Sequence, residues 1–313
     1  MAGGPDHLRP GGDFLRRGPE SGTFGPGSAT VRRITDLQPA GINVFAKINH
    51  VAIVSEKYAL LASFYESLFG MRRSPKGKIN RAITVGDGYV GLNINPRKAG
   101  RPSGLDHFGV EVEDVEAVFD RMRSRYPGAD WVQRPSTRPF AGITANDPDG
   151  NVFDLSQKQM ANRSGVYLEN DGSQNERHIS HVALRTMRPD EMARFYTDVL
   201  QLAEQNAKPG DPNHYLTDGK MTLMIMPWRI KNYTGQSILP TGMDHVGFTV
   251  ESVDALKNDV EELVGVNPVM NPIPLGKGKE GGARLELLEQ QCPIGEHFLS
   301  DPDFTLIAVR GAH

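Results

Sequence analysis

The sequence of 313 residues contains very little cysteine, no long apolar run and no excess of charge of either sign. Its single cysteine, Cys292, excludes an intrachain disulfide framework and any cysteine-rich zinc or iron–sulfur site. The formal net charge of −3 removes the electrostatic basis for non-specific nucleic-acid binding. No apolar run approaches the roughly 18–20 residues of a membrane span. These absences predict a soluble, cytoplasmic protein that binds neither nucleic acid nor membranes.

The first 43 residues differ in composition from the rest, because they are rich in Gly, Pro, Arg and Ser and lack sustained periodicity. Such a segment cannot bury enough apolar surface to offset the entropy of ordering it. Its arginine pairs have no apolar region beside them, so a secretory signal is not indicated. We expect residues 1–43 to form a flexible arm. The arm either has no function or acts as a substrate lid or a clasp between subunits.

A short motif that occurs four times is the most informative feature of the remaining chain. Each copy is a His followed by alternating small and β-branched residues, which is typical of a strand. The copies are INHVAIV at 48–54, LDHFGVEV at 105–112, ISHVALR at 179–185 and MDHVGFTV at 243–250. Each copy precedes a segment with the apolar spacing of a helix, and then two or three strand candidates. The pattern predicts four units, each a strand, a helix and further strands.

The four units fall into two pairs. A Phe-Tyr dipeptide lies 14 residues after the His in both the first and the third unit, and the second and fourth units align without a gap through their helices. Residues 159–177 are polar and rich in turn formers, which indicates a linker. We therefore predict a first domain at 44–158, a linker at 159–177 and a second domain at 178–313, which agrees with about 150 residues per domain.

Taken together, these motifs resemble the vicinal oxygen chelate superfamily, which includes glyoxalase I, bleomycin-resistance proteins, fosfomycin-resistance enzymes and extradiol ring-cleavage dioxygenases. The resemblance rests on the four His strands, on FYESLFGM at 64–71 and on DPDGNVFDLSQ at 147–157, and it covers about residues 46–310. It implies an α+β fold of four tandem βαβββ modules that form two cupped half-barrel domains, with a metal at the bottom of a cup. Four modules in one chain resemble the two-domain extradiol dioxygenases. Family habit and exposed strand edges favour a homo-oligomer.

The resemblance places metal ligands on the first strand of each module in a pair and on the last strand of the second module. In the first pair these positions are His50, His107 and Asp154. Two imidazoles and one carboxylate on a rigid sheet are a facial triad for a divalent metal, with positions left open for a bidentate substrate or dioxygen. Fe(II) is the expected metal, with Mn(II) or Zn(II) as alternatives. The competing interpretation is that the two His residues pack at strand ends and Asp154 is solvated.

Two features of the first pair depart from the family's pattern. The family usually has Glu where Asp154 stands, and glyoxalase-like members carry another carboxylate where this sequence offers only Asn93 or Asn95. A four-ligand glyoxalase site is therefore incomplete, whereas a three-ligand extradiol site remains. Extradiol cleavage also uses a His as an acid–base group, which the first pair lacks. Tyr89 is a candidate substitute, since a phenol also relays a proton.

The second pair retains His181 and His245 at the positions equivalent to His50 and His107, but Ala308, or Ile307 if a gap is counted, replaces the carboxylate. Three alternatives stay open: the first pair holds the metal, another carboxylate completes a site in the second pair, or neither pair binds metal. The candidate replacement carboxylates are Glu286, Glu289 and Glu296. We expect the first cup to bind metal and the second cup to bind none.

The fourth unit contains two stretches with separate interpretations. NPVMNPI at 267–273 is a strand candidate, and GKGKEGG at 276–282 predicts a mobile hairpin that would suit a lid. Cys292 is five residues from His297, the nearest base in sequence. We interpret Cys292 as a small buried residue before a turn rather than as a thiol nucleophile.

Three functions follow as alternatives. The first is a metal-dependent oxidoreductase of the extradiol dioxygenase type, acting on a catecholic or other vicinally oxygenated small molecule. The second is a glyoxalase-like metal-dependent lyase or isomerase. The third is a non-enzymatic binding protein of the resistance type, because fold does not fix function. The four-module architecture favours the first alternative, and the catalytic acid–base residue stays unassigned.

Overall fold

A computed structural model of the chain describes residues 45–79, 81–135, 138, 140–160, 165–170, 175–229, 241–276 and 278–312. The arm expected at residues 1–43 and part of the linker expected at 159–177 lie outside these residues. None of the described helices is long and apolar enough to cross a membrane.

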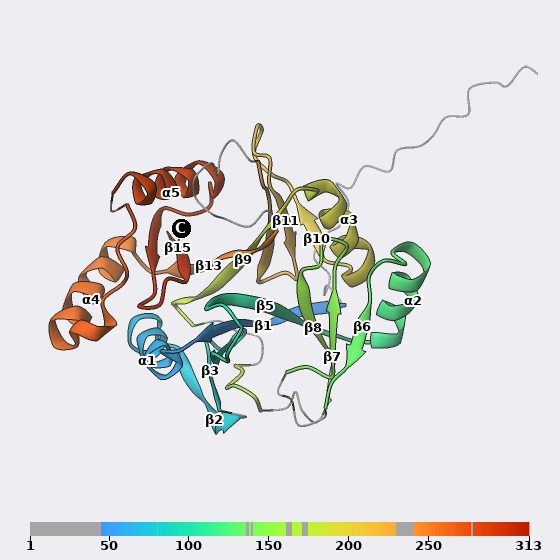
Figure 1. Ribbon diagram of the computed structural model, residues 1–313, viewed down its shortest axis with the longest axis horizontal. Coiled ribbons are helices and arrows are strands. Elements are labelled where there is room, and N and C mark those ends of the chain that lie inside the picture. The colour runs from blue at the N-terminus through green and yellow to red at the C-terminus, as the bar shows by residue number, and fades with distance from the viewer. Residues whose placement is uncertain are drawn as a thin grey trace, which may run out of the picture. The chain divides into compact units, whose positions relative to one another are not determined.

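Eight strands form the first sheet, in the order β2-β3-β4-β1-β5-β8-β7-β6 (Figure 1). The strands are β1 (Ala46–Ser55), β2 (Arg72–Ile79), β3 (Ala82–Gly86), β4 (Gly91–Pro96), β5 (Gly104–Val112), β6 (Trp131–Gln133), β7 (Ile143–Asn146) and β8 (Val152–Gln157). Helix α1 (Tyr58–Phe69) follows β1 and helix α2 (Val115–Arg125) follows β5. The two His strands, β1 and β5, pair antiparallel at the centre. This sheet therefore consists of the two βαβββ modules that the sequence predicts.

Seven strands form the second sheet, in the order β10-β11-β12-β9-β13-β15-β14. The strands are β9 (His178–Thr186), β10 (Ala203–Gln205), β11 (His214–Thr217), β12 (Thr222–Pro227), β13 (Gly242–Val250), β14 (His297–Ser300) and β15 (Leu306–Gly311). The helices are α3 (Pro189–Leu200), α4 (Val253–Val266) and α5 (Gly278–Gln291). The central strands β9 and β13 repeat the antiparallel pairing of β1 and β5. The predicted α+β fold, two curved sheets of βαβββ-like modules, is confirmed.

The fourth module departs from the sequence prediction in two places. The expected strand at 267–273 is a 3₁₀ helix over Pro268–Met270, since proline fits a first helical position and cannot donate to a ladder. The expected hairpin at 276–282 is wrong because helix α5 begins at Gly278. Leu285, Leu288 and Cys292 follow one another at helical spacing and pack into one apolar cluster of the second sheet, which stabilises α5 despite its glycines.

One hydrophobic cluster runs through both sheets and holds them together. Phe69 of α1 stacks on Phe248 of β13 with ring centroids 3.9 Å apart, and Phe195 of α3 meets Phe153 of β8 edge to face at 6.1 Å. The helix that follows the first strand of each sheet therefore packs against the other sheet. Because the two sheets share this core, the structure does not divide the chain at the expected domain boundaries. The domains at 44–158 and 178–313 therefore stay a prediction.

Candidate metal centres

Three neighbouring strands bring together the donors predicted for the first cup. His50 on β1 lies opposite Gly109 on β5, and Asp154 on β8 lies beside the same glycine. His107 Nε2 is 3.1 Å from Asp154 Oδ2, and His50 Nε2 is 3.9 Å from the same oxygen. All three side chains are buried. The structure therefore brings His50, His107 and Asp154 together, as the sequence predicts. That these three residues bind a metal ion stays a prediction.

Gly109 determines where the His50 ring can lie. A Cβ atom added to Gly109 would be 1.9 Å from His50 Cε1, so the imidazole crosses directly over the glycine backbone. On this sheet only glycine permits such a close approach of a side chain. Phe140 stacks on the His50 ring at a centroid distance of 4.2 Å. The ring is thus held between a bare strand and an aromatic side chain.

The outer nitrogens of both rings have oxygen partners, which orients the inner nitrogens toward Asp154. His50 Nδ1 is 2.7 Å from Asn49 Oδ1, and His107 Nδ1 is 2.7 Å from Asp106 Oδ2. Burial disfavours the cationic form of His107, but its contacts with Asp106 and Asp154 outweigh that effect and raise its pKa to about 9. Burial likewise opposes the charge of Asp154, yet the same His107 contact outweighs it and holds the pKa of Asp154 well below its usual value.

Asp154 also has two partners that are not histidines. Arg138 Nη2 donates to Asp154 Oδ2 at 3.0 Å, and Thr144 Oγ1 donates to Oδ1. The two imidazole nitrogens lie 3.1 and 3.9 Å from the carboxylate oxygen, and all three donor atoms lie within 4.8 Å of one another, which is compatible with the roughly 3 Å separation of adjacent ligands around an ion with bonds of about 2.1 Å. The donor set fits a divalent ion. The Arg138 guanidinium would compete with that ion for Oδ2.

A cavity of about 480 Å³ opens over His107 and Asp154. Its wall combines apolar side chains such as Val54 and Val152 with several cationic groups. The cationic residues lining it are Lys98, Arg101, Arg134 and Arg138. Asp106 and Asp154 also line the cavity, where they pair with Arg101 and Arg138, so the wall keeps an excess of positive charge that favours a small anionic molecule.

Tyr89 does not line this cavity, although the sequence made it a candidate acid–base group. Its ring lies under two ammonium groups, with Lys47 Nζ 4.5 Å and Lys220 Nζ 5.2 Å from the centroid. Asn93 does line the cavity and accepts a hydrogen bond from Thr84 Oγ1 at 3.2 Å. The structure therefore gives no support to the Tyr89 hypothesis.

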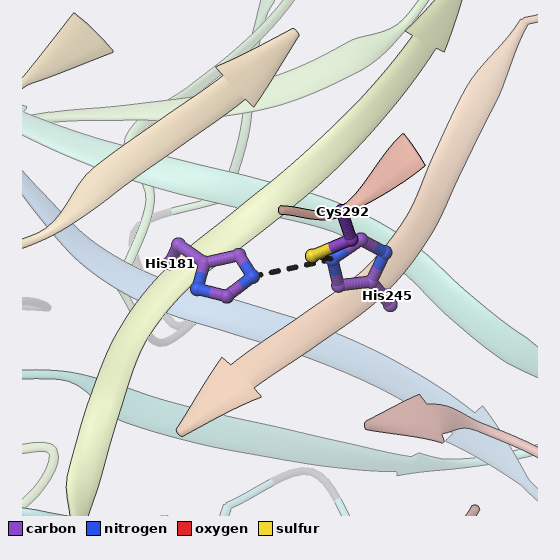
Figure 2. Close-up of side chains that lie close together, drawn as sticks. All are labelled: His181, His245 and Cys292. Carbon is purple, nitrogen blue, oxygen red and sulfur yellow. Dashed lines mark hydrogen bonds between the residues drawn. The ribbon is translucent and has the colours of Figure 1, made fainter. Parts of the chain in front are cut away.

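The second cup repeats the strand register of the first with a different third donor. His181 pairs with Gly247, which in turn pairs with Ala308, so Ala308 occupies the position of Asp154. Cys292, at the end of α5, places its Sγ 3.4 Å from His245 Nε2 (Figure 2). None of the three Glu residues considered from the sequence belongs to the potential donor groups among the described residues. The sequence analysis interpreted Cys292 correctly as buried but missed it as a donor, because no local pattern brings it to His245.

Comparison with known proteins settles the family. The Glyoxalase/Bleomycin resistance protein/Dioxygenase superfamily matches residues 47–155 and 178–283. The chain belongs to this superfamily. The first matched stretch runs from β1 into β8, and the second runs from β9 into α5 and ends before β14 and β15. A search of curated protein sequences finds no match.

Solved structures from this superfamily share the architecture at low sequence identity. A Mn(II)-bound glyoxalase from Novosphingobium aromaticivorans is 16% identical, with 85% of this chain and 81% of that chain covered and a TM-score of 0.57. The 2,3-dioxygenase LapB from Pseudomonas sp. KL28 is 13% identical, with 85% and 92% covered and a TM-score of 0.56. The 2,2′,3-trihydroxybiphenyl 1,2-dioxygenase from Sphingomonas wittichii strain RW1 is 10% identical, with 86% and 91% covered and a TM-score of 0.53. At these identities the similarity shows the fold and leaves the reaction open.

Proposed function

We propose that the first cup binds a divalent metal ion and that the protein is an extradiol-type dioxygenase acting on an anionic catechol or a related vicinally oxygenated small molecule. The observation that carries the proposal is the cavity that opens over His107 and Asp154 with a cationic wall. His50, His107 and Asp154 would hold the ion, with Fe(II) the first choice and Mn(II) the second. Several solved structures with this architecture are described as dioxygenases, which supports the reaction class.

The residues around the cavity would bind the substrate and lower the pKa of its hydroxyl group. A bound ion would supply Lewis acidity and a path for electrons from substrate to dioxygen. The four basic side chains of the wall stabilise a substrate anion, so a hydroxyl of the substrate loses its proton more readily and less is required of a protein base. Arg138 donates to Asp154 in this structure and borders the cavity, so a substrate carboxylate or phenolate is an alternative partner for it.

One observation favours a second candidate, an anion-binding protein that uses no metal. The Arg138 guanidinium and the His107 ring both contact Asp154, and together they already compensate its charge. A site closed in this way is stable without a cation. The two candidates differ in whether the first cup binds a divalent metal ion.

Anaerobic purification followed by loading with Fe(II) or Mn(II) tests the proposed function. We expect one ion in the first cup and dioxygen uptake with catechols, faster when the catechol carries a carboxylate. Asp154→Ala should abolish both because it removes the only anionic donor, whereas His181→Ala in the second cup should leave the ion in the first cup unchanged. Absence of dioxygen uptake with every catechol tested would overturn the proposal. Conversion of a catechol without consumption of dioxygen would indicate a lyase or isomerase, and tight binding of a catechol by the metal-free protein would indicate the second candidate.

A further inference from the structure

The second cup holds a cluster of donors that the proposed reaction does not use. His181 on β9, His245 on β13 and Cys292 after α5 point toward one another, as Figure 2 shows. His181 Nε2 is 3.2 Å from His245 Nε2, and Cys292 Sγ is 3.4 Å from the same His245 atom. All three side chains are 2% exposed or less. Three ligand atoms from three distant segments therefore meet in one buried place.

The hydrogen bonds around the two rings fix which nitrogens face inward. His245 Nδ1 is 2.7 Å from Asp244 Oδ1, and His181 Nδ1 is 3.1 Å from Ser180 Oγ. Asp244 is itself held by the guanidinium groups of Arg185 and Arg284. Oxygen partners on the outer nitrogen are the usual way in which proteins present the inner nitrogen of a histidine to a metal. The inner nitrogens of the two rings, both Nε2, lie 3.2 Å apart, so one ring donates a hydrogen bond to the other, and a cation between them would take the place of that shared proton.

The separations agree with a small ion at the centre. Zinc bonds of about 2.05 Å to nitrogen and 2.3 Å to sulfur, at tetrahedral angles, put two nitrogens roughly 3.4 Å apart and nitrogen roughly 3.6 Å from sulfur. The observed distances of 3.2 Å and 3.4 Å are close to both values. Ala308 leaves space where the first cup has its carboxylate, and Cys292 enters from the helix instead.

The chemistry of the donors selects the ion. A thiolate with two imidazoles favours zinc, cobalt or copper over Fe(II) and Mn(II), which gain least from soft ligands. Apolar side chains surround Cys292, with Met224, Met226, Leu288 and Phe298 in the same cluster. His181, His245 and Cys292 are 2% exposed or less, so their ligand atoms lie inside the core of the second sheet. Cys292 as the third ligand would fasten α5 to the two central strands of the second sheet.

We propose that His181, His245 and Cys292 bind one thiolate-preferring transition-metal ion, zinc in the first instance, that fixes α5 onto the second sheet. This site is separate from the first cup and does not depend on the reaction proposed there. The expectation from the sequence, that the second cup binds no metal, considered carboxylates alone as the third ligand. Two cups with different donors would then hold different ions in one chain.

Co(II) is the probe that reports sulfur coordination directly. The reduced full-length chain, stripped of metal by a chelator, should develop a thiolate-to-cobalt charge-transfer band that saturates at one Co(II) per chain and disappears on addition of one equivalent of Zn(II). Cys292→Ser should lose the band, whereas Asp154→Asn, the matched change in the first cup, should retain it. No band in the unmodified chain, or a band that persists in Cys292→Ser, would overturn the proposal.

A second measurement needs no substitution, so it remains decisive if Cys292→Ser fails to fold. Buried Cys292 reacts with an alkylating reagent only when α5 opens, and Zn(II) at about 100 times its Kd should slow that labelling roughly 100-fold because it binds the closed form alone. Mn(II) at the same concentration should leave the rate unchanged. Equal rates with and without Zn(II), or equal protection by Mn(II), would contradict a thiolate-selective site.

Discussion

At the scale of single residues, each cup depends on one glycine. In both cups this glycine lies two positions after the His of the second central strand, His107 or His245. Gly109 lies under the His50 ring and Gly247 lies under the His181 ring, where an added Cβ would be 1.9 Å and 1.8 Å from the respective Cε1 atoms. The sequence shows both glycines within strands, where glycine weakens the strand but marks a close approach. The structure shows why glycine is required at both positions: a side chain there would occupy the space of the imidazole ring.

Alanine at these two glycines should disturb one cup each. Gly109→Ala should displace His50 and lower metal binding in the first cup, while Gly247→Ala should displace His181 and remove the cobalt–thiolate band of the second. Overpacking of this kind costs about 1–3 kcal/mol of stability, so both chains should still fold. Metal analysis and cobalt spectra of both variants check this. If either variant changed both cups equally, the glycines would act on the fold rather than on their rings.

Arg138 competes with any cation for Asp154 Oδ2, which its Nη2 approaches to 3.0 Å. Arg138→Gln should therefore raise the affinity of the first cup for Mn(II) by roughly tenfold, equivalent to about 1.4 kcal/mol. The same change should weaken binding of a carboxylated catechol, since one guanidinium is lost from the cavity wall. Calorimetric titration with Mn(II), and with the catechol, measures both. Lys98→Gln, at another position of the same wall, is the control, and it should leave Mn(II) affinity unchanged.

At the scale of elements, one tyrosine on α1 and one on α3 join these helices to the opposite sheet in equivalent ways. The hydroxyl of Tyr65 on α1 donates to Asp301 at 3.1 Å, and the hydroxyl of Tyr196 on α3 donates to Asp147 at 2.8 Å. These tyrosines belong to the Phe-Tyr dipeptides that the sequence shows 14 residues after a His in the first and third units. The repeat therefore encodes an interface as well as a module.

Removal of either hydroxyl should destabilise the protein, because it leaves a buried aspartate with one donor fewer. Tyr65→Phe and Tyr196→Phe should each lower the free energy of unfolding by about 1–3 kcal/mol, as measured in urea. Tyr126→Phe is the matched control, since its hydroxyl bonds to the half-exposed Asp198 and its loss should cost less. Equal losses in all three variants would show that burial of the aspartate does not increase the cost.

The order of strands and helices could be predicted from the sequence because local patterns carry it, whereas the fourth module could not. The glycines at the start of α5 conceal a helix whose stability comes from Leu285 and Leu288 packing on the sheet, which is a tertiary effect. For the same reason the meeting of Cys292 with His245, 47 residues apart, has no local signal. The donors of the first cup were predictable because all three lie on repeated strands.

At the scale of the whole molecule, four buried aspartates link the two sheets in two equivalent pairs. Beside Asp147 and Asp301, Asp87 accepts from Ile179 N and Asp218 from Ile48 N, both at 2.7 Å. Burial raises the pKa of all four carboxyls. Because the folded pKa exceeds the unfolded one, the stability associated with these groups is complete at low pH and declines as pH rises through the folded pKa values.

An ion pair at the ends of β9 and β13, both in the second sheet, responds to pH in the opposite direction. Arg177, just before β9, donates to both carboxylate oxygens of Glu251 and to the Leu68 carbonyl at the end of α1. The Arg177 hydrogen bond lowers the pKa of Glu251 below its ordinary value of 4.5. A lowered folded pKa stabilises the protein fully above pH 4.5, and this contribution is lost as pH falls through the lowered value.

Glu251→Gln isolates this contribution, since the amide keeps a hydrogen-bond acceptor for Arg177 and removes only the charge. The difference in free energy of unfolding between the unmodified chain and the variant should be below about 1 kcal/mol at neutral pH, because the pair is partly exposed. It should shrink toward zero as pH falls below 4.5, the ordinary pKa. The four buried aspartates are common to both chains, so their opposing effect cancels in the difference. Urea unfolding at a series of pH values measures it, with Glu261→Gln on α4 as the control. A difference independent of pH would show that the ion pair contributes through packing rather than through charge.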